Sequence, residues 1–198
     1  MSSYAPTPDS VRLALAAEAP AIARIQRRGW QQRLAPEAAA VLGDVALDAM
    51  VEAWHRAIIR PPAARFRVLV AVSSGDGVVG FAATVPSADA DAAADDGEIE
   101  EFVIDPPAQR RGHGSRLLHA CVDTLSADGF GRARWWLGAT DDVLRAFATD
   151  AGWAADGASR EIGVDDDEQP QVRLKQVRLH TDIVAHPTPP ALPESGRG

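Results

Sequence analysis

Hydrophobic positions recur along the chain with two different periods, which predicts a mixed fold of helices and strands. Spacings of three and four residues predict helices from Ala19 to about Trp30, over residues 36–59 with a break near Gly43, from Gly112 to before Gly129, and over residues 141–151. Alternating or continuous apolar runs predict strands over residues 11–15, 66–72, 78–85, 98–104 and 132–139, with a final pair from Trp153 onward and over 172–179.

Glycine-rich and acidic segments mark the connections between these elements. Residues 73–77 read Ser-Ser-Gly-Asp-Gly between two strand patterns and predict a hairpin, because glycine takes the positive φ that tight turns require. Residues 87–97 are rich in alanine and aspartate and contain little to bury, which predicts a solvated loop. Residues 165–170 predict an acidic loop between the last two strands.

The chain is long enough for one domain with a sizeable core. It has 198 residues, of which 46% are hydrophobic and 24% are charged, an ordinary balance for a globular protein. We predict a flexible lead-in over residues 1–9, a single domain over residues 10–182, and a proline-rich, disordered tail over residues 183–198.

The overall charge limits the partners that the chain can bind. The formal net charge of −8 argues against a nucleic-acid surface, which needs clustered positive charge, and favours cationic amines as ligands. Cys121 is the single cysteine, the first residues lack a secretory signal, and no apolar run approaches the roughly 20 residues that span a bilayer. We therefore predict a cytoplasmic protein without membrane contact, and a homodimer remains open.

The most informative stretch joins a strand to a helix. Phe102, Val103 and Ile104 favour a buried strand, which Asp105-Pro-Pro ends because proline has no amide hydrogen to donate to a neighbouring strand. Residues 109–115 follow and read Gln-Arg-Arg-Gly-His-Gly-Ser, where two glycines let a ligand approach the backbone closely.

The start of the predicted helix has the properties of a phosphate-binding loop. The first turn of a helix has amide hydrogens without internal acceptors and the positive end of the helix dipole, and Arg110, Arg111 and Arg116 add positive charge. A dinucleotide fingerprint needs a third glycine where Leu117 stands, and a Walker A loop needs a lysine where Ser115 stands. Neither nucleotide motif fits, and an ordinary turn with solvated arginines is the alternative.

A family resemblance supports the ligand-binding interpretation. The segment Gln109-Arg110-Arg111-Gly112-His113-Gly114 resembles the Gln/Arg-x-x-Gly-x-Gly/Ala signature of the GNAT superfamily of N-acetyltransferases, and it follows a strand ending Val103-Ile104-Asp105-Pro106, as in that family. The order of predicted elements is also that of the GNAT fold. The resemblance spans residues 10–182 and implies a single α+β (mixed α/β) domain, with a mostly antiparallel twisted sheet of about seven strands, splayed between the fourth and fifth strands.

The resemblance implies acetyl-CoA as co-substrate and no metal. Its pantetheine arm would pair with the main chain of Phe102, Val103 and Ile104. Its pyrophosphate would bind the amides of Gln109, Arg110, Arg111, Gly112, His113 and Gly114, with Ser115 as a further donor.

The reaction that the resemblance implies is attack by a neutral amine on the thioester, and a base must first deprotonate the amine. In a regular strand Glu98 and Glu100 share a face and Glu101 lies opposite, unless a bulge intervenes. Relatives often place an acidic residue where Glu100 stands and some where Glu98 stands. We therefore predict Glu100, then Glu98, as the base; solvated charges at the start of a strand are the alternative.

One departure from the family bears on the mechanism. Many members carry an asparagine and a tyrosine in the helix after the fifth strand, and the tyrosine contacts the thiol as general acid. The matching positions here are Asp141 and Ala148, and the only tyrosine is Tyr4. A thiol with an ordinary pKa near 8.5 can leave without a proton donor, with Thr149 or a water as substitutes. The departure also leaves open a catalytically silent acyl-CoA-binding or sensing module.

The acceptor is predicted to be the amine of a small molecule, with a protein amine as the less favoured class. Its pocket is predicted to involve the first two helices, including Trp30 and Gln31. The five histidines show no metal-ligand spacing, and Cys121 falls on the buried stripe of its helix, as expected for an inert core thiol. A scaffold protein that recruits a partner through its tail prolines is a third interpretation.

Overall fold

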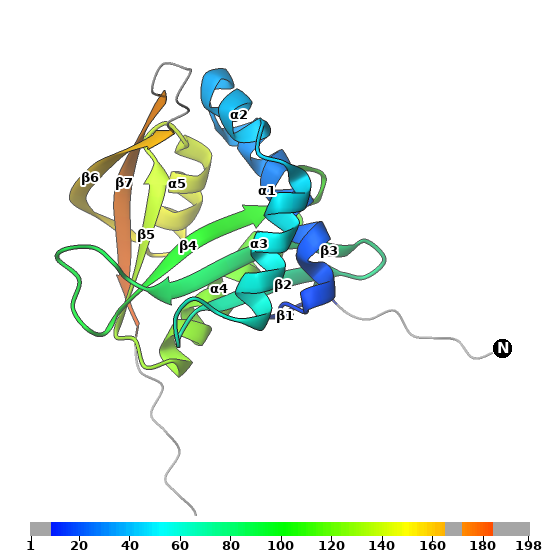
Figure 1. Ribbon diagram of the computed structural model, residues 1–198. Helices are drawn as coiled ribbons and strands as arrows, with labels where there is room; N and C mark the ends of the chain where they lie inside the picture. The colour runs from blue at the N-terminus through cyan, green and yellow to red at the C-terminus, as the bar shows by residue number, and fades with distance from the viewer. Residues whose placement is uncertain (1–8, 165–171, 184–198) are drawn as a thin grey trace, which may run out of the picture.

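The computed structural model describes residues 9–164 and 172–183, so residues 1–8, the acidic loop and the tail from residue 184 lie outside the described residues. A seven-stranded sheet with the order β1-β2-β3-β4-β5-β7-β6 forms its centre (Figure 1). Its strands are β1 Ser10–Leu13, β2 Arg67–Ser73, β3 Gly77–Pro86, β4 Asp96–Ile104, β5 Arg132–Gly138, β6 Ala154–Val164 and β7 Val172–Asp182. Only the β4–β5 pair is parallel.

Helices lie against both faces of this sheet. They are α1 Ala19–Arg33, α2 Pro36–Gly43, α3 Leu47–Ile59, α4 His113–Ala127 and α5 Asp142–Asp150, with short 3-10 turns at η1 Ala16–Glu18 and η2 Pro106–Ala108. The predicted break near Gly43 separates α2 from α3. The prediction of a mixed α+β fold with a mostly antiparallel sheet is therefore confirmed.

Two apolar clusters hold the helices on the sheet. Behind it, α4 and α5 pack on a cluster that includes Phe102, Leu117 and Trp135. In front of it, α1 and α3 cover a second cluster that includes Ile25 and Val103 (Figure 1). A Cβ atom on Gly29 of α1 would lie 2.6 Å from the Val103 side chain, so a glycine is what allows α1 to approach β4 closely.

The parallel strands part in the middle of the sheet. Their pairing runs from Asp96↔Arg132 to Ile99↔Trp135, whereas β4 continues to Ile104 and β5 to Gly138. Figure 1 shows β4 turning toward α1 while β5 follows β7. The predicted splay between the fourth and fifth strands is confirmed, and the loop that leads into α4 begins at the open end of β4.

The prediction of a solvated loop over residues 87–97 holds for residues 87–95, most of which are exposed, but is wrong at its end. Asp96 and Gly97 are buried residues of β4, and the preceding Asp89 and Asp91 pair with arginines of β5 and β7. Arg134 lies 2.7 Å from Asp91 and 2.6 Å from Asp96, and Arg178 donates a 2.8 Å hydrogen bond to Asp89. The segment has little apolar surface, but its carboxylates find buried cationic partners that local composition does not reveal.

Candidate active site

The loop between β4 and α4 has an unusual backbone. Gly112 precedes the first helical residue with φ of 82°, in the left-handed region. Arg110 has φ of 62° and is the one non-glycine residue with positive φ among those the structure describes. Such strained positions persist where the surrounding structure requires them, and they concentrate at ligand sites.

This backbone leaves a row of amides without protein acceptors. Within the described chain, no acceptor contacts the N–H groups of residues 110–115. The Arg116 N–H is the next to be bonded, at 3.3 Å from the Gly112 carbonyl oxygen, and the Gln109 N–H donates to Pro106 at 3.3 Å. A run of free amides at the positive end of a 15-residue helix is an anion-binding arrangement. We call residues 110–115 the amide cradle.

The side chains around the amide cradle have separate roles. Arg111 pairs with Asp76 at 3.2 Å and Arg116 with Asp9 at 2.8 Å, whereas Arg110 has no ion-pair partner among the described residues. His113 is buried and its Nδ1 lies 3.2 Å from the Arg116 guanidinium. Arg110 is therefore the cation of this loop that is free for a ligand.

The Gln109 side chain, just before the amide cradle, links the loop to α1 and to the end of β4. Its Nε2 donates to the Gln32 side chain of α1 at 2.8 Å and to the Ile104 carbonyl at 3.2 Å. Arg33, at the end of α1, donates to the Phe102 carbonyl at 3.2 Å. The carbonyls of Phe102 and Ile104 thus take partners from outside the sheet, beyond the point where β4 and β5 cease to pair.

A β-bulge at Glu100 changes which glutamates face the same way. In the β3–β4 register Ala83 pairs with Glu101 and Thr84 with Ile99, which leaves Glu100 without a partner. Because the bulge inserts one residue, Glu101 returns to the face of Ala83, which is the face that α1 and α3 cover. Ile99 points to the opposite face, which α4 covers, and because side chains alternate along a strand its neighbour Glu98 lies on the same face as Glu101. The regular-strand expectation that Glu101 lies on the face opposite Glu98 therefore does not hold.

Each of the three carboxylates has a raised pKa, for different reasons. Glu98 is buried and accepts a 3.2 Å hydrogen bond from Ser87, and burial, reinforced by the Asp89 charge, raises its pKa. Glu100 keeps contact with solvent, yet partial desolvation raises its pKa. Burial raises the pKa of Glu101 against the opposing effect of Arg33, which lies 3.7 Å away.

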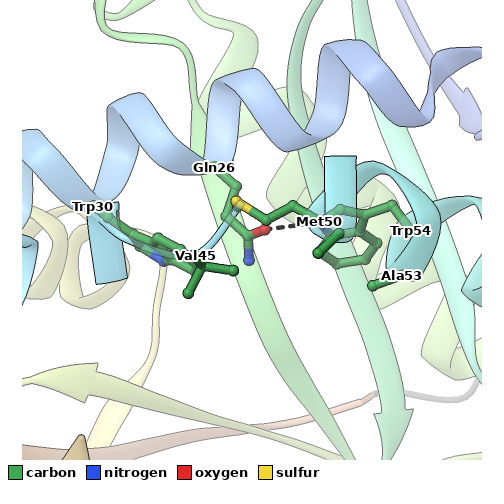
Figure 2. Close-up of a pocket in the computed structure, with 7 residues that line it drawn as sticks. Gln26, Trp30, Val45, Met50, Ala53 and Trp54 are labelled. Carbon is green, nitrogen blue, oxygen red and sulfur yellow. Dashed lines mark hydrogen bonds between the residues drawn. The ribbon is translucent and has the colours of Figure 1, made fainter. Parts of the chain in front are cut away.

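A pocket of about 290 Å³ opens between α1 and α3 (Figure 2). Its walls are mostly apolar and are formed by Gln26, Trp30, Val45, Ala49, Met50, Ala53 and Trp54. We call it the α1–α3 pocket. The structure places Trp30 in its wall but leaves Gln31 exposed and outside it. Sequence reasoning missed Gln26, although Gln26, Trp30 and Arg33 follow one another at helical spacings of four and three.

The front face of β5 and β7 is polar. Trp136 lies under two guanidinium groups, 4.3 Å from Arg160 and 5.3 Å from Arg178. Its indole N–H donates to Asp89 at 3.1 Å. Arg134 points to the same side, since Trp135 between them belongs to the apolar cluster behind the sheet. A charged surface thus adjoins the buried Glu98.

The helix after β5 contains no proton donor at the position that the sequence analysis singled out. Ala148 is fully buried, and Asp141 caps α5 by accepting a 3.0 Å hydrogen bond from the Leu144 amide. Thr149 is exposed, and Tyr4 lies outside the described residues. Cys121 is buried in the core behind the sheet, and burial raises its pKa, in agreement with the prediction of an inert thiol.

No group of three or more potential metal ligands occurs in residues 9–164 and 172–183. Within the same ranges, no helix is long and apolar enough to cross a membrane.

The fold carries a loop of amides suited to an anionic ligand, and comparison with known sequences identifies the family. A model of the acetyltransferase (GNAT) family matches residues 23–153 of the 198 residues. The chain therefore belongs to the GNAT acetyltransferase family. No curated protein sequence matches it.

Solved structures share the fold at low sequence identity. A putative acetyltransferase, yncA from Salmonella typhimurium, solved with acetyl-CoA, has a TM-score of 0.65 and 16% identity over 94% of this chain and 100% of its own. A phosphinothricin acetyltransferase from Sinorhizobium meliloti in complex with acetyl-CoA has a TM-score of 0.67 and 18% identity, covering 96% of this chain and 98% of its own. The ribosomal-protein-S18-alanine N-acetyltransferase from Escherichia coli has a TM-score of 0.58 and 15% identity, covering 88% and 94%.

Proposed function

We propose that this protein transfers an acetyl group from acetyl-CoA to a primary amine, most simply that of a small molecule. The single observation that carries the proposal is the amide cradle, whose N–H groups have no protein acceptor in the described chain and lie at the open end of the β4–β5 splay. Family membership supports the same function. Two of the similar structures were solved with acetyl-CoA.

The residues present fit this co-substrate. The amides of residues 110–115, the Ser115 hydroxyl and the free Arg110 guanidinium would hold its pyrophosphate. Main-chain groups of Phe102, Val103 and Ile104 would hold the pantetheine arm along the separated edge of β4. Arg33, now bonded to the Phe102 carbonyl, must give up that bond if the arm pairs there.

When bound, acetyl-CoA supplies a thioester carbonyl that a neutral amine can attack. The new bond joins the amine nitrogen to the acetyl carbon, the carbon–sulfur bond breaks, and the thiolate leaves with CoA. The proton lost by the amine goes to a carboxylate, directly or through water. We assign this role to Glu100 first and Glu98 second. The bulge at Glu100 supports the assignment, because bulges re-aim a side chain.

The raised pKa values of these glutamates set the expected pH dependence. A carboxylate must be ionised to accept the proton, so activity falls as pH falls through the raised pKa of the base, above its ordinary value of 4.5. A base whose pKa lies closer to the working pH is also the stronger one.

A second candidate function follows from the helix after β5. Ala148 offers no proton donor where many relatives carry a tyrosine, and this favours a module that binds acyl-CoA without turnover. The similar structures do not choose an acceptor, since one is described as acting on phosphinothricin and another on a ribosomal-protein alanine.

Two measurements separate these functions. Calorimetric titration with acetyl-CoA is expected to show binding at micromolar concentration, and its absence would reject both. Thiol release with a panel of amines then tests turnover. Glu100→Gln is expected to lower kcat by about 10²-fold or more, whereas Glu52→Gln, an exposed carboxylate on α3, leaves it unchanged. Tight binding without turnover on any amine would instead favour the silent module.

A further inference from the structure

We infer that the acceptor is a primary amine carrying an aromatic or similarly bulky apolar group, which the α1–α3 pocket receives while Glu101 binds the ammonium. This inference rests on the proposed function and names its substrate class. The geometry behind it is a polar bridge that joins an apolar pocket to a carboxylate on the face of β4 covered by α1 and α3.

The α1–α3 pocket has the size and lining for an apolar group. Its volume of about 290 Å³ is walled by two indole rings, Trp30 and Trp54, and by the Met50 thioether. Ala49 and Ala53 lie one helical turn apart on α3, and their small side chains leave the space open. Val45 at its rim is 40% exposed, so a ligand would cover apolar surface that now faces water.

The pocket is held in shape before any ligand binds. Trp54 stacks edge-on against the buried Phe81 at 5.0 Å. Arg27 of α1 bonds the Val45 carbonyl and lies 3.7 Å from the Met50 sulfur, which fixes the start of α3 against α1. A preformed cavity does not have to be ordered on binding, so contacts within it contribute more fully to affinity.

Gln26 connects the pocket to the carboxylate. Its Oε1 accepts a 2.8 Å hydrogen bond from the Trp54 indole, as Figure 2 shows, and its Nε2 donates to Glu101 at 3.4 Å. Arg33 lies 3.7 Å from Glu101 on the other side, one turn beyond Trp30. Glu101 therefore lies beside the stretch of α1 that carries Trp30 into the pocket wall.

Charge complementarity selects a cationic ligand. Glu101 and Glu98 lie on the face of β4 that α1 covers, and the net charge of the chain is −8. Arg33 is the one cation within ion-pair distance of Glu101 among the described residues, and at 3.7 Å it is a loose partner. An ammonium group beside Glu101 would be drawn in as a cation and would then need deprotonation before attack.

The test compares 2-phenylethylamine with ethylamine, which differ by the phenyl group alone. With saturating acetyl-CoA, kcat/KM is expected to be at least about tenfold higher for 2-phenylethylamine. Ala53→Trp fills the pocket and is expected to remove that preference, because it lowers kcat/KM for 2-phenylethylamine at least about tenfold more than for ethylamine. Ala127→Trp, at the far end of α4, is the matched control and should change neither amine. Glu101→Gln should raise KM for both amines, since it removes the charge and keeps a partner for Gln26.

The outcomes distinguish this inference from the proposed function. Turnover of ethylamine with no preference for 2-phenylethylamine, or an Ala53→Trp effect equal for both amines, would overturn the inference and leave the acetyltransferase intact. If no amine is acetylated, calorimetric titration of the wild-type protein with 2-phenylethylamine still tests whether the α1–α3 pocket binds this class of amine. Binding that Ala53→Trp weakens at least about tenfold supports the pocket, and absence of wild-type binding rejects it.

Discussion

The amide cradle and the polar front face of β5 and β7 present polar groups in opposite ways. The cradle uses main-chain N–H groups of consecutive residues, 110–115, and its left-handed positions at Arg110 and Gly112 expose them. The front face uses side chains that come from distant segments, with Arg134 and Arg178 meeting the aspartates of residues 89–96. The first region has donors without acceptors among the described residues, whereas the second pairs its charges internally.

The two regions are therefore sensitive to different kinds of substitution. A backbone cradle depends on φ values and tolerates changes of side chain, because its donors are common to all residues but proline. A buried ion cluster depends on each member, because removing one partner leaves the other charges without compensation. Substitutions that alter only backbone freedom or only charge therefore separate the two regions.

The largest effect is expected at the front face. Arg134→Met removes the partner of Asp96, whose side chain is 3% exposed, and is expected to cost about 3–5 kcal/mol in the free energy of unfolding. Arg132→Met is the matched control on the same strand, because its partner Asp182 is 74% exposed and such surface pairs contribute about 0–1 kcal/mol. Urea unfolding of both variants measures the difference. Equal losses would show that the cluster is no more than a set of surface pairs.

A smaller effect on stability, but a selective effect on binding, is expected in the amide cradle. Gly112 and Gly129 lie at the two ends of α4 with φ of 82° and 85°, and neither would meet close backbone atoms through a Cβ. Valine at either position is strained and is expected to cost about 1–2 kcal/mol.

Only Gly112→Val is expected to weaken acetyl-CoA binding, by at least about tenfold, because relaxing the strain turns the cradle amides away from a common point. Gly129→Val should bind as the wild type does. Calorimetry on both folded variants measures this, and a cradle that binds normally after Gly112→Val would place the anion site elsewhere.

The smallest expected effect concerns pH. Burial and the Asp89 charge raise the pKa of Glu98 above its ordinary value of 4.5. At pH values between 4.5 and this raised pKa, the folded chain therefore binds more protons than the unfolded chain. The contribution of Glu98 to stability therefore falls as pH rises through this window, and the full penalty remains at pH 7. Glu98→Gln should stabilise the fold at pH 7, where the Glu98 carboxylate is charged, and should have no such effect near pH 3, where it is protonated.

Thermal unfolding across this pH range measures the Glu98 effect. The exposed Glu52→Gln on α3 serves as reference and is expected to show no gain in stability between pH 3 and pH 7. A destabilising Glu98→Gln at pH 7 would mean that the carboxylate charge is favourable in the folded state, contrary to its burial.

Several elements of the fold could be predicted because their causes are local. The spacing of Leu117, Leu118 and Cys121 predicted α4, and all three are buried in its packed face. Residues 73–77 predicted the β2–β3 hairpin, where Gly75 and Gly77 have positive φ. The cradle loop was also visible in sequence, because its glycine spacing and its position between strand and helix occupy one short segment.

Other features could not be predicted because their causes are not local. Residues 87–97 contain no apolar side chain larger than that of alanine, and nothing nearby in sequence indicates that Arg134 would pair with a buried Asp96 and Arg178 with Asp89. The bulge at Glu100 arises from the register with β3, so the alternation of glutamates along β4 could be resolved only in the sheet. The α1–α3 pocket brings Trp30 to Trp54 across two helices.

The sequence by itself determined the order of elements, the helical and strand periods, and a loop suited to phosphate, since each depends on neighbouring residues. Tertiary structure alone decided the end of the β4–β5 pairing at Ile99, the reorientation of Glu101 toward Gln26, and the closure of the α1–α3 pocket. These depend on contacts between segments far apart in the chain, where strand register and helix packing set which side chains meet.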